Sequence, residues 1–340
     1  MADEPKLTRK EWKIIEKLEE TEQALEPKKT IKDIAKKLKN TVWIKNDPPS
    51  RDYVFMQPGE FGADVGFLPQ GKTAMLISPG GVGKTFALIQ CAIAVATGGK
   101  WFGTYQASKP AGVVLITAEE DELELWKRIR GILLALGIDR KPHLEELLGE
   151  NLTIIPLCGI KQRFTDKTGV RTIEFEDLKN FLDTEENCSL VILDPASYFM
   201  GPDCEIDNAA ATDWITLLNK LAQTAGKPAI LVAHHTNKSA LGNNSINQAI
   251  ARGSSALVDG VRWVAALQRK SDEEINKIMF KLVKSNHCFI PDGLELERDT
   301  QQGGMLKPST IKTSDENSDY KRPKQQENST NSLTDNSYTN

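Results

Sequence analysis

The chain reads TAMLISPGGVGKTFALIQ from Thr73 to Gln90. An apolar run typical of a buried strand is followed by a glycine-rich turn and then by residues typical of a helix. The turn matches the phosphate-loop pattern G-x-x-x-x-G-K-[ST], except that Ser78 replaces its first glycine. In such a loop, backbone N–H groups and the start of the helix converge on phosphate oxygens. The stretch therefore predicts an α/β fold built around a strand, a phosphate loop and a helix.

Each part of the loop has an expected role. Lys84 supplies positive charge to the β and γ phosphates of a nucleotide, and Thr85 can ligate magnesium. ATP and Mg²⁺ are therefore the expected cofactors. The alternative, a glycine turn that binds nothing, is disfavoured because a lysine and a threonine follow the turn directly. The other residues expected to contact the nucleotide are Ser78, Pro79, Gly80, Gly81, Val82, Gly83 and Phe86.

Further apolar runs alternate with helical segments along the rest of the chain. Uninterrupted Val, Ile and Leu runs separated by helices indicate a mostly parallel sheet that is covered by helices on both faces. The expected strands are GVVLIT, NLTIIPL, SLVILD, PAILVAHH, GVRWVAAL and IMFKLVKS.

The 340 residues allow one large domain with appendages. We predict a helical N-terminal appendage and linker over residues 1–48, a core over 49–308 and a disordered tail over 309–340, where apolar residues nearly vanish. Apolar residues at helical spacing predict two short N-terminal helices, with Thr30 capping the second. A charged helical appendage is the preferred interpretation, and a helix-turn-helix is the alternative. These apolar residues are Trp12, Ile14, Ile15, Leu18, Ile31, Ile34, Ala35 and Leu38.

Composition excludes several classes of protein. No run approaches the roughly 18 apolar residues of a membrane span, and the N-terminus lacks the apolar stretch of a signal peptide, so we expect a cytoplasmic protein without membrane contact. The 5 cysteines show no metal-binding spacing, and neither a zinc site nor a disulfide framework is indicated. The formal net charge of -4 means that any contact with nucleic acid must be local.

Two acids stand at the ends of expected core strands. Asp194 ends the run SLVILD and is interpreted as the acid that orients magnesium, with a helix cap as the alternative. Glu119 is the first acid after GVVLITA and is the expected catalytic base for the attacking water. Glu120 and Asp121 are interpreted as solvated acids in the first turn of the next helix.

Two histidines and one arginine complete the candidates. His234 and His235 end the run AILVAHH, where they could sense the γ phosphate; function is expected at His234 first and at His235 second. Arg262 begins an apolar strand, a costly position for a guanidinium unless it pairs with an acid or a phosphate. It is a candidate arginine finger that reaches a neighbouring subunit's nucleotide, and a buried pair with a carboxylate is the alternative.

With these landmarks in order, residues 52–308 resemble the plasmid RepA-type hexameric replicative helicases, which are RecA-like ATPases. The resemblance is carried by LISPGGVGKT, LITAEED, VILD, LVAHHTNK, ARGSSALVDGVRW and GGMLKP. Serine in place of the first phosphate-loop glycine is usual in that family. The chain departs from the small plasmid helicases in its N-terminal segment and its asparagine-rich tail.

The resemblance implies a RecA-like core in a homo-hexameric ring, with ATP bound between subunits and single-stranded DNA in the centre. It assigns phosphate and magnesium to Lys84 and Thr85, catalysis to Glu119, and the finger to Arg262 with Arg252 as a second candidate. It suggests a replication initiator or a primase as a further partner. Two loops would face the channel, one from Met200 onward and one from Thr236 to Gln248.

Three functions compete at this point. The first is a DNA helicase or translocase that hydrolyses ATP at the subunit interfaces of a ring. The second is a RecA-like regulatory or recombination ATPase that binds DNA without unwinding it. The third, a small-molecule kinase, is weaker because the chain shows neither an arginine-rich lid nor an acceptor pocket.

Overall fold

The computed structural model describes residues 30–35, 46–59, 61–167, 169–235, 255–271, 274–299 and 304–309. The chain divides into two units, one ending at Arg51 and the other beginning at Asp52. The expected helix around Trp12 and the expected tail from residue 310 onward lie outside the described residues.

The described part of the first unit contains helix α2 (Ile31–Ile34). Thr30 caps it, as predicted, because its side chain accepts a hydrogen bond from the Asp33 N–H and the Asp33 carboxylate accepts one from the Thr30 N–H. Ile31 and Ile34 are both exposed. This short helix therefore buries no apolar face of its own within the unit as described.

The second unit is built on a central sheet in which the described residues form 9 strands, in the order β13-β12-β11-β10-β3-β9-β8-β6-β7. The strands from β10 to β7 pair in parallel, and the strands from β10 to β13 pair antiparallel. In the parallel part, the loops that follow the carboxyl ends of the strands all lie at the same edge of the sheet. In chain order the strands are β3 (Thr73–Ser78), β6 (Gly112–Thr117), β7 (Leu152–Pro156), β8 (Cys188–Asp194), β9 (Ala229–His235), β10 (Trp263–Arg269), β11 (Lys277–Ser285), β12 (Leu294–Arg298) and β13 (Leu306–Pro308).

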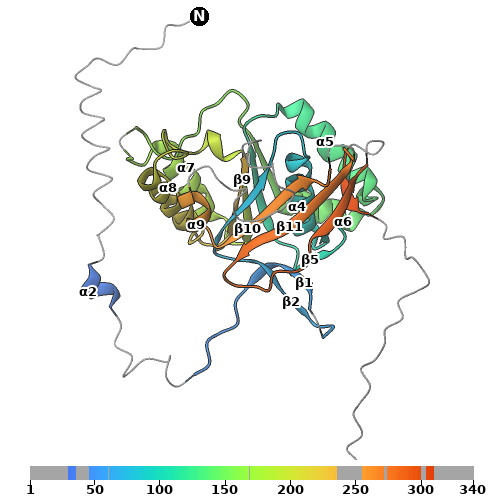
Figure 1. Cartoon of the computed structure of the whole chain (residues 1–340), viewed down its shortest axis with the longest axis horizontal. Helices are drawn as coiled ribbons and strands as arrows, with labels where there is room; N and C mark the ends of the chain where they lie inside the picture. The colour runs from blue at the N-terminus through green and yellow to red at the C-terminus, as the bar shows by residue number, and fades with distance from the viewer. Residues whose placement is uncertain are drawn as a thin grey trace, which may run out of the picture. The chain divides into compact units, whose positions relative to one another are not determined.

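Helices cover both faces of this sheet, which confirms the predicted fold class (Figure 1). One face packs against α4, α5 and α6, and the other packs against α7, α8 and α9. Residues along each central strand alternate between these two apolar clusters, as pleating requires. The helices are α4 (Lys84–Thr97), α5 (Glu122–Ala135), α6 (Pro142–Asn151), α7 (Ile173–Thr184), α8 (Asn208–Leu221) and α9 (Ser255–Gly260), with short 3-10 turns η2 (Ile138–Arg140) and η3 (Ala196–Tyr198).

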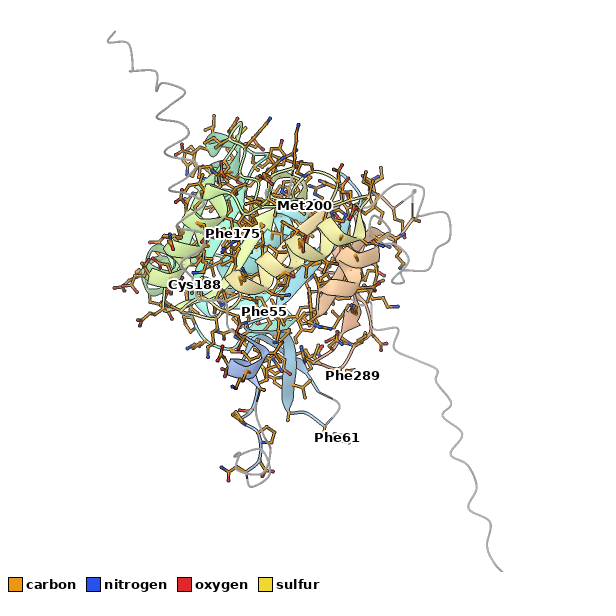
Figure 2. The ribbon with its side chains drawn as sticks, turned by 90° about the vertical axis from the view of Figure 1, so that its left-hand side faces the viewer. Phe55, Phe61, Phe175, Cys188, Met200 and Phe289 are labelled. Carbon is orange, nitrogen blue, oxygen red and sulfur yellow. The ribbon has the colours of Figure 1, made fainter. Side chains whose placement is uncertain are left out.

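A second, antiparallel sheet was not predicted from the sequence. Its order is β2-β1-β5-β4, and its strands are β1 (Tyr53–Pro58), β2 (Asp64–Pro69), β4 (Lys100–Trp101) and β5 (Tyr105–Ala107). Aromatic rings attach it to the central sheet: Phe67 stacks on Tyr105 at 4.0 Å and meets Trp263 edge-on at 5.3 Å. Figure 2 shows Phe61, which is 97% exposed, on the hairpin that projects from this sheet.

None of the helices in the described part of the chain combines the length and the apolar character that a bilayer crossing requires.

Candidate active site

The phosphate loop lies between β3 and α4, as predicted. Ser78 is buried at the end of β3, and α4 begins at Lys84. Gly81 has φ 76° and Gly83 has φ 107°, a backbone region that side chains rarely adopt. The glycines therefore permit the turn that aims the start of α4 at the edge of the sheet.

Asp194 and the two residues at the start of α4 come together beside this loop. The Thr85 hydroxyl donates a hydrogen bond to Asp194 Oδ2 at 2.9 Å, and Lys84 Nζ lies 3.8 Å from Asp194 Oδ1. Burial lowers the pKa of Lys84, against the opposing effect of Asp194. Burial likewise raises the pKa of Asp194, against the opposing effect of Lys84. The geometry favours a metal-orienting acid over a helix cap, since Asp194 contacts the loop's own lysine and threonine.

The two histidines point to opposite faces of the sheet. The side chains of Ala229, Leu231 and Ala233 pack in the cluster around α4. His235 comes next at the same spacing of two residues, so it lies on the same face. Its Nε2 lies 3.1 Å from Lys84 Nζ, so the neutral ring accepts a hydrogen bond from the ammonium.

His234 belongs to the other face and is 5% exposed. The sequence favoured His234 over His235 as the phosphate sensor, and the geometry reverses that preference. The reason is the two-residue period of a strand, which brings only every second side chain to the loop.

Burial, with smaller effects from Lys84 and His235, lowers the pKa of His234 to about 4 from an ordinary 6.5. Between these values the unfolded chain binds a proton that the folded chain does not, so stability falls as the pH drops through this window. Between pH 7 and pH 5 the wild type should lose about 2 kcal/mol more unfolding free energy than His234→Gln, because the variant has no histidine at this position to take up a proton. Urea unfolding at the two pH values measures this difference.

The matched control is His143→Gln on α6, where the histidine is exposed. This variant should keep the wild-type pH dependence. Equal losses in the wild type and in His234→Gln would contradict the buried neutral state of His234.

The acids after β6 separate into different positions. Glu119 Oε1 lies 3.9 Å from His235 Nε2, which places this carboxylate at the loop. Glu120 instead pairs with Arg128, at 2.6 Å between Oε1 and Nη1. Asp121 caps α5 by accepting a hydrogen bond from the Glu124 N–H. The geometry therefore favours Glu119 as the base among the three.

Arg262 lies at the opposite edge of the sheet from the phosphate loop. It precedes β10, whose Trp263 is in register with Ala74 near the start of β3, and its N–H donates to the Thr73 carbonyl. The expected buried position is wrong, because Arg262 is exposed. No ion pair of Arg262 with a carboxylate is found among the described residues, so the alternative of a buried pair loses its basis. Arg252 lies outside the described residues.

Sequence reasoning missed a group of arginines around Phe86. The Cζ atoms of Arg128 and Arg298 lie 5.2 Å and 5.1 Å from the centre of the Phe86 ring. Burial lowers the pKa of Arg298, and the neighbouring charges of Arg128 and Arg269 add to the effect. Arg128 is paired with Glu120 and Glu124, so among the described residues Arg269 and Arg298 are the members of this group without an ion pair.

Two of these arginines border the phosphate loop itself. Arg269 Nη2 lies 3.8 Å from the position that a Cβ on Gly81 would take, and Arg298 Cζ lies 4.0 Å from the same position on Gly83. No short motif could have identified them, because they come from β10 and β12. A signal was present only for Arg269, which ends a core strand at the edge where ligands bind.

The loops expected to face DNA are only partly described. The loop after β8 carries Asp203, Glu205 and Asp207 between Met200 and α8, and no lysine or arginine. Its charge is therefore unfavourable for phosphate contacts. The loop from Thr236 to Gln248 lies outside the described residues.

The described residues fit magnesium. Mg²⁺ takes oxygen ligands and is typically held by one or two carboxylates together with substrate phosphates and water. Thr85 and Asp194 offer such oxygens, and Asp194 Oδ1 is buried without a hydrogen-bond partner among the described residues. The described residues contain no cluster of three or more His, Cys, Asp or Glu that could hold a metal. Binding of the ion would therefore depend on the nucleotide.

A family model described as an AAA domain matches residues 37–240, more than half of the chain. The chain belongs to the AAA domain family. This AAA domain is also similar to a solved structure that is described as an ATPase domain, with a TM-score of 0.50 and 13% identity over 72% of this chain and 86% of that chain.

A second similar structure is that of a DnaB-like replicative helicase, described with its interactions with primase. The TM-score is 0.50 and the identity 13%, over 70% of this chain and 57% of that chain. At this identity the similarity shows the fold, and it confirms the RecA-like core. The AAA domain thus has the fold of a P-loop ATPase, which implies nucleotide binding.

Proposed function

We propose that this protein is an ATP-hydrolysing DNA helicase or translocase of the RepA type, which acts as a homo-hexameric ring around single-stranded DNA. One observation carries the proposal. The phosphate loop, Asp194 and Glu119 are assembled at one edge of the sheet, while Arg262 stands exposed at the other edge. An Arg262 that acts on a nucleotide must therefore come from a neighbouring copy of the chain.

Each residue then has a defined task. Lys84 leaves His235 and binds the β and γ phosphate oxygens, and Glu119 takes a proton from the attacking water. Thr85 and Asp194 would hold Mg²⁺, which neutralises phosphate charge when bound. His235, once released, is free to report the γ phosphate to the segment that follows β9.

The arginines beside the loop support binding within one chain. Arg269 and Arg298 add positive charge at Gly81 and Gly83, where the negative charge of a nucleotide would arrive. Arg262 of a neighbouring copy then acts in the transition state, when negative charge shifts toward the leaving oxygen. Binding and turnover are therefore assigned to different arginines.

Contact with DNA is assigned to the segment from Thr236 to Gln248. The acidic loop after β8 repels phosphates, whereas this segment carries Lys238. One lysine binds a strand weakly, and repetition in a ring would supply the avidity. A primase or an initiator is the proposed further partner, since one of the similar structures is described with primase.

A second candidate function is a RecA-like regulatory or recombination ATPase that binds DNA without unwinding. The acidic charge of the loop after β8 favours it, because a translocating motor needs strong contacts with the strand. Both candidates share the nucleotide site described above.

Gel filtration with ATP and Mg²⁺, followed by ATPase assays with and without single-stranded DNA, tests the proposal. We expect elution as an oligomer and faster hydrolysis with DNA, together with separation of a forked duplex. An intact fork despite DNA-stimulated hydrolysis would assign the second function. A monomer whose turnover ignores DNA would exclude both.

A further inference from the structure

Two buried oxygens at the edge of the sheet lack hydrogen-bond partners among the described residues. They are Thr117 Oγ1, at the end of β6, and Asp194 Oδ1, at the end of β8. Thr117 is 1% exposed and Asp194 is 4% exposed. A buried hydroxyl without a partner is costly, so its presence at this edge requires a reason.

Thr117 and Asp194 lie side by side. They are register partners in the parallel pairing of β6 with β8, and the Ala118 N–H donates to the Asp194 carbonyl. Register partners in a sheet point to the same face. For Thr117 this is the face of Val113 and Leu115, which pack in the cluster around α4. The hydroxyl therefore faces the side on which Thr85 already contacts Asp194.

We propose that Thr117 is a positioning residue for magnesium, an inference that rests on the proposed function. Its hydroxyl oxygen accepts a hydrogen bond from a water of the ion's hydration shell, and Asp194 Oδ1 accepts from the same shell. Mg²⁺ keeps several of its waters in proteins and is sensitive to the placement of its ligands. Such outer groups orient the inner ligands and strengthen metal binding.

The chemistry explains why a threonine ends this strand. Valine has the same shape, suits a strand equally well and leaves no unpaired hydroxyl. A purely structural role would therefore favour valine at position 117. A hydroxyl is useful there only when a hydrogen-bonding partner, such as a water bound to the ion, arrives with the ligand.

The test measures binding of a fluorescent, non-hydrolysable ATP analogue in MgCl₂ and in EDTA. The Mg²⁺ gain is the ratio of the analogue's affinity in MgCl₂ to its affinity in EDTA. We expect Thr117→Val to bind the analogue like the wild type in EDTA and to show a Mg²⁺ gain about 10-fold smaller than that of the wild type. Thr117→Ser restores the hydroxyl and should restore the gain. The thermal midpoint of Thr117→Val should be unchanged or raised, because an unpaired buried hydroxyl is removed.

Thr73→Val is the matched control. Thr73 is buried at the far end of β3, and its hydroxyl donates to Asn219 Oδ1 at 2.9 Å. This variant should lower the thermal midpoint and leave the Mg²⁺ gain intact.

The outcomes separate two failures. A wild type without any Mg²⁺ gain would overturn the proposed magnesium-nucleotide site, and the role of Thr117 with it. A full gain in both the wild type and Thr117→Val would overturn only the role of Thr117. An equal loss of affinity in MgCl₂ and EDTA would also overturn it, since the metal would then not be involved.

Discussion

Lys84→Ala is expected to lower ATP turnover by about 10³-fold and to weaken nucleotide binding. The reason is geometric, because Lys84 is the first residue of α4 and its ammonium lies between Asp194 and His235. No other cation among the described residues forms an ion pair with Asp194. Steady-state hydrolysis and titration with a fluorescent nucleotide measure the two effects.

Lys109→Ala is the control for this change, because Lys109 is exposed away from the loop. It should keep wild-type turnover. Thermal unfolding of Lys84→Ala excludes loss of the fold as the cause. Wild-type turnover in a folded Lys84→Ala protein would show that the loop does not bind the phosphates as proposed.

Arg262→Ala is expected to keep nucleotide binding and to lower turnover by about 10³-fold or more. Its guanidinium is exposed at the edge of the sheet remote from the loop of its own chain, so binding within that chain does not depend on it. Binding and hydrolysis assays on the purified variant test both halves of this expectation.

Mixing two inactive variants makes the prediction sharper. Arg262→Ala retains an intact phosphate loop, and Lys84→Ala retains an intact arginine. A site formed between the two then contains both groups, so the mixture should regain turnover that neither variant shows alone. Gel filtration confirms that mixed oligomers form. Mixed oligomers without activity would assign Arg262 a structural role instead.

Local sequence patterns are sufficient to predict the central sheet and those site residues that directly follow its strands. The phosphate loop, Asp194 and Glu119 each follow directly from a core strand, and the ends of parallel strands meet at one edge. Their proximity therefore follows from the topology. The choice between His234 and His235 did not follow, because it depends on which face the first residue of β9 points to.

Features built from distant segments were not accessible from the sequence. β1 pairs with β5 across the whole of α4, and β5 has only 3 residues, too few to carry a clear alternation of apolar residues. Arg128, Arg269 and Arg298 meet only after three separate elements have packed. The exposure of Arg262 does not follow from the sequence pattern, because this arginine directly precedes the buried residues of β10.

Strand β10 joins the two ends of this arrangement. Arg262 precedes it, and Arg269 ends it beside Gly81 of the phosphate loop. Its 7 residues span about 23 Å and are hydrogen-bonded to β3 on one side and to β11 on the other. Such an extended strand hardly changes its length, so a displacement of one end moves the other end as well. In a ring, a phosphate loop that moves when nucleotide binds would displace the Arg269 end of β10. The Arg262 end would then shift in the site of the next copy. The order in which neighbouring sites hydrolyse ATP would then depend on the stiffness of the sheet.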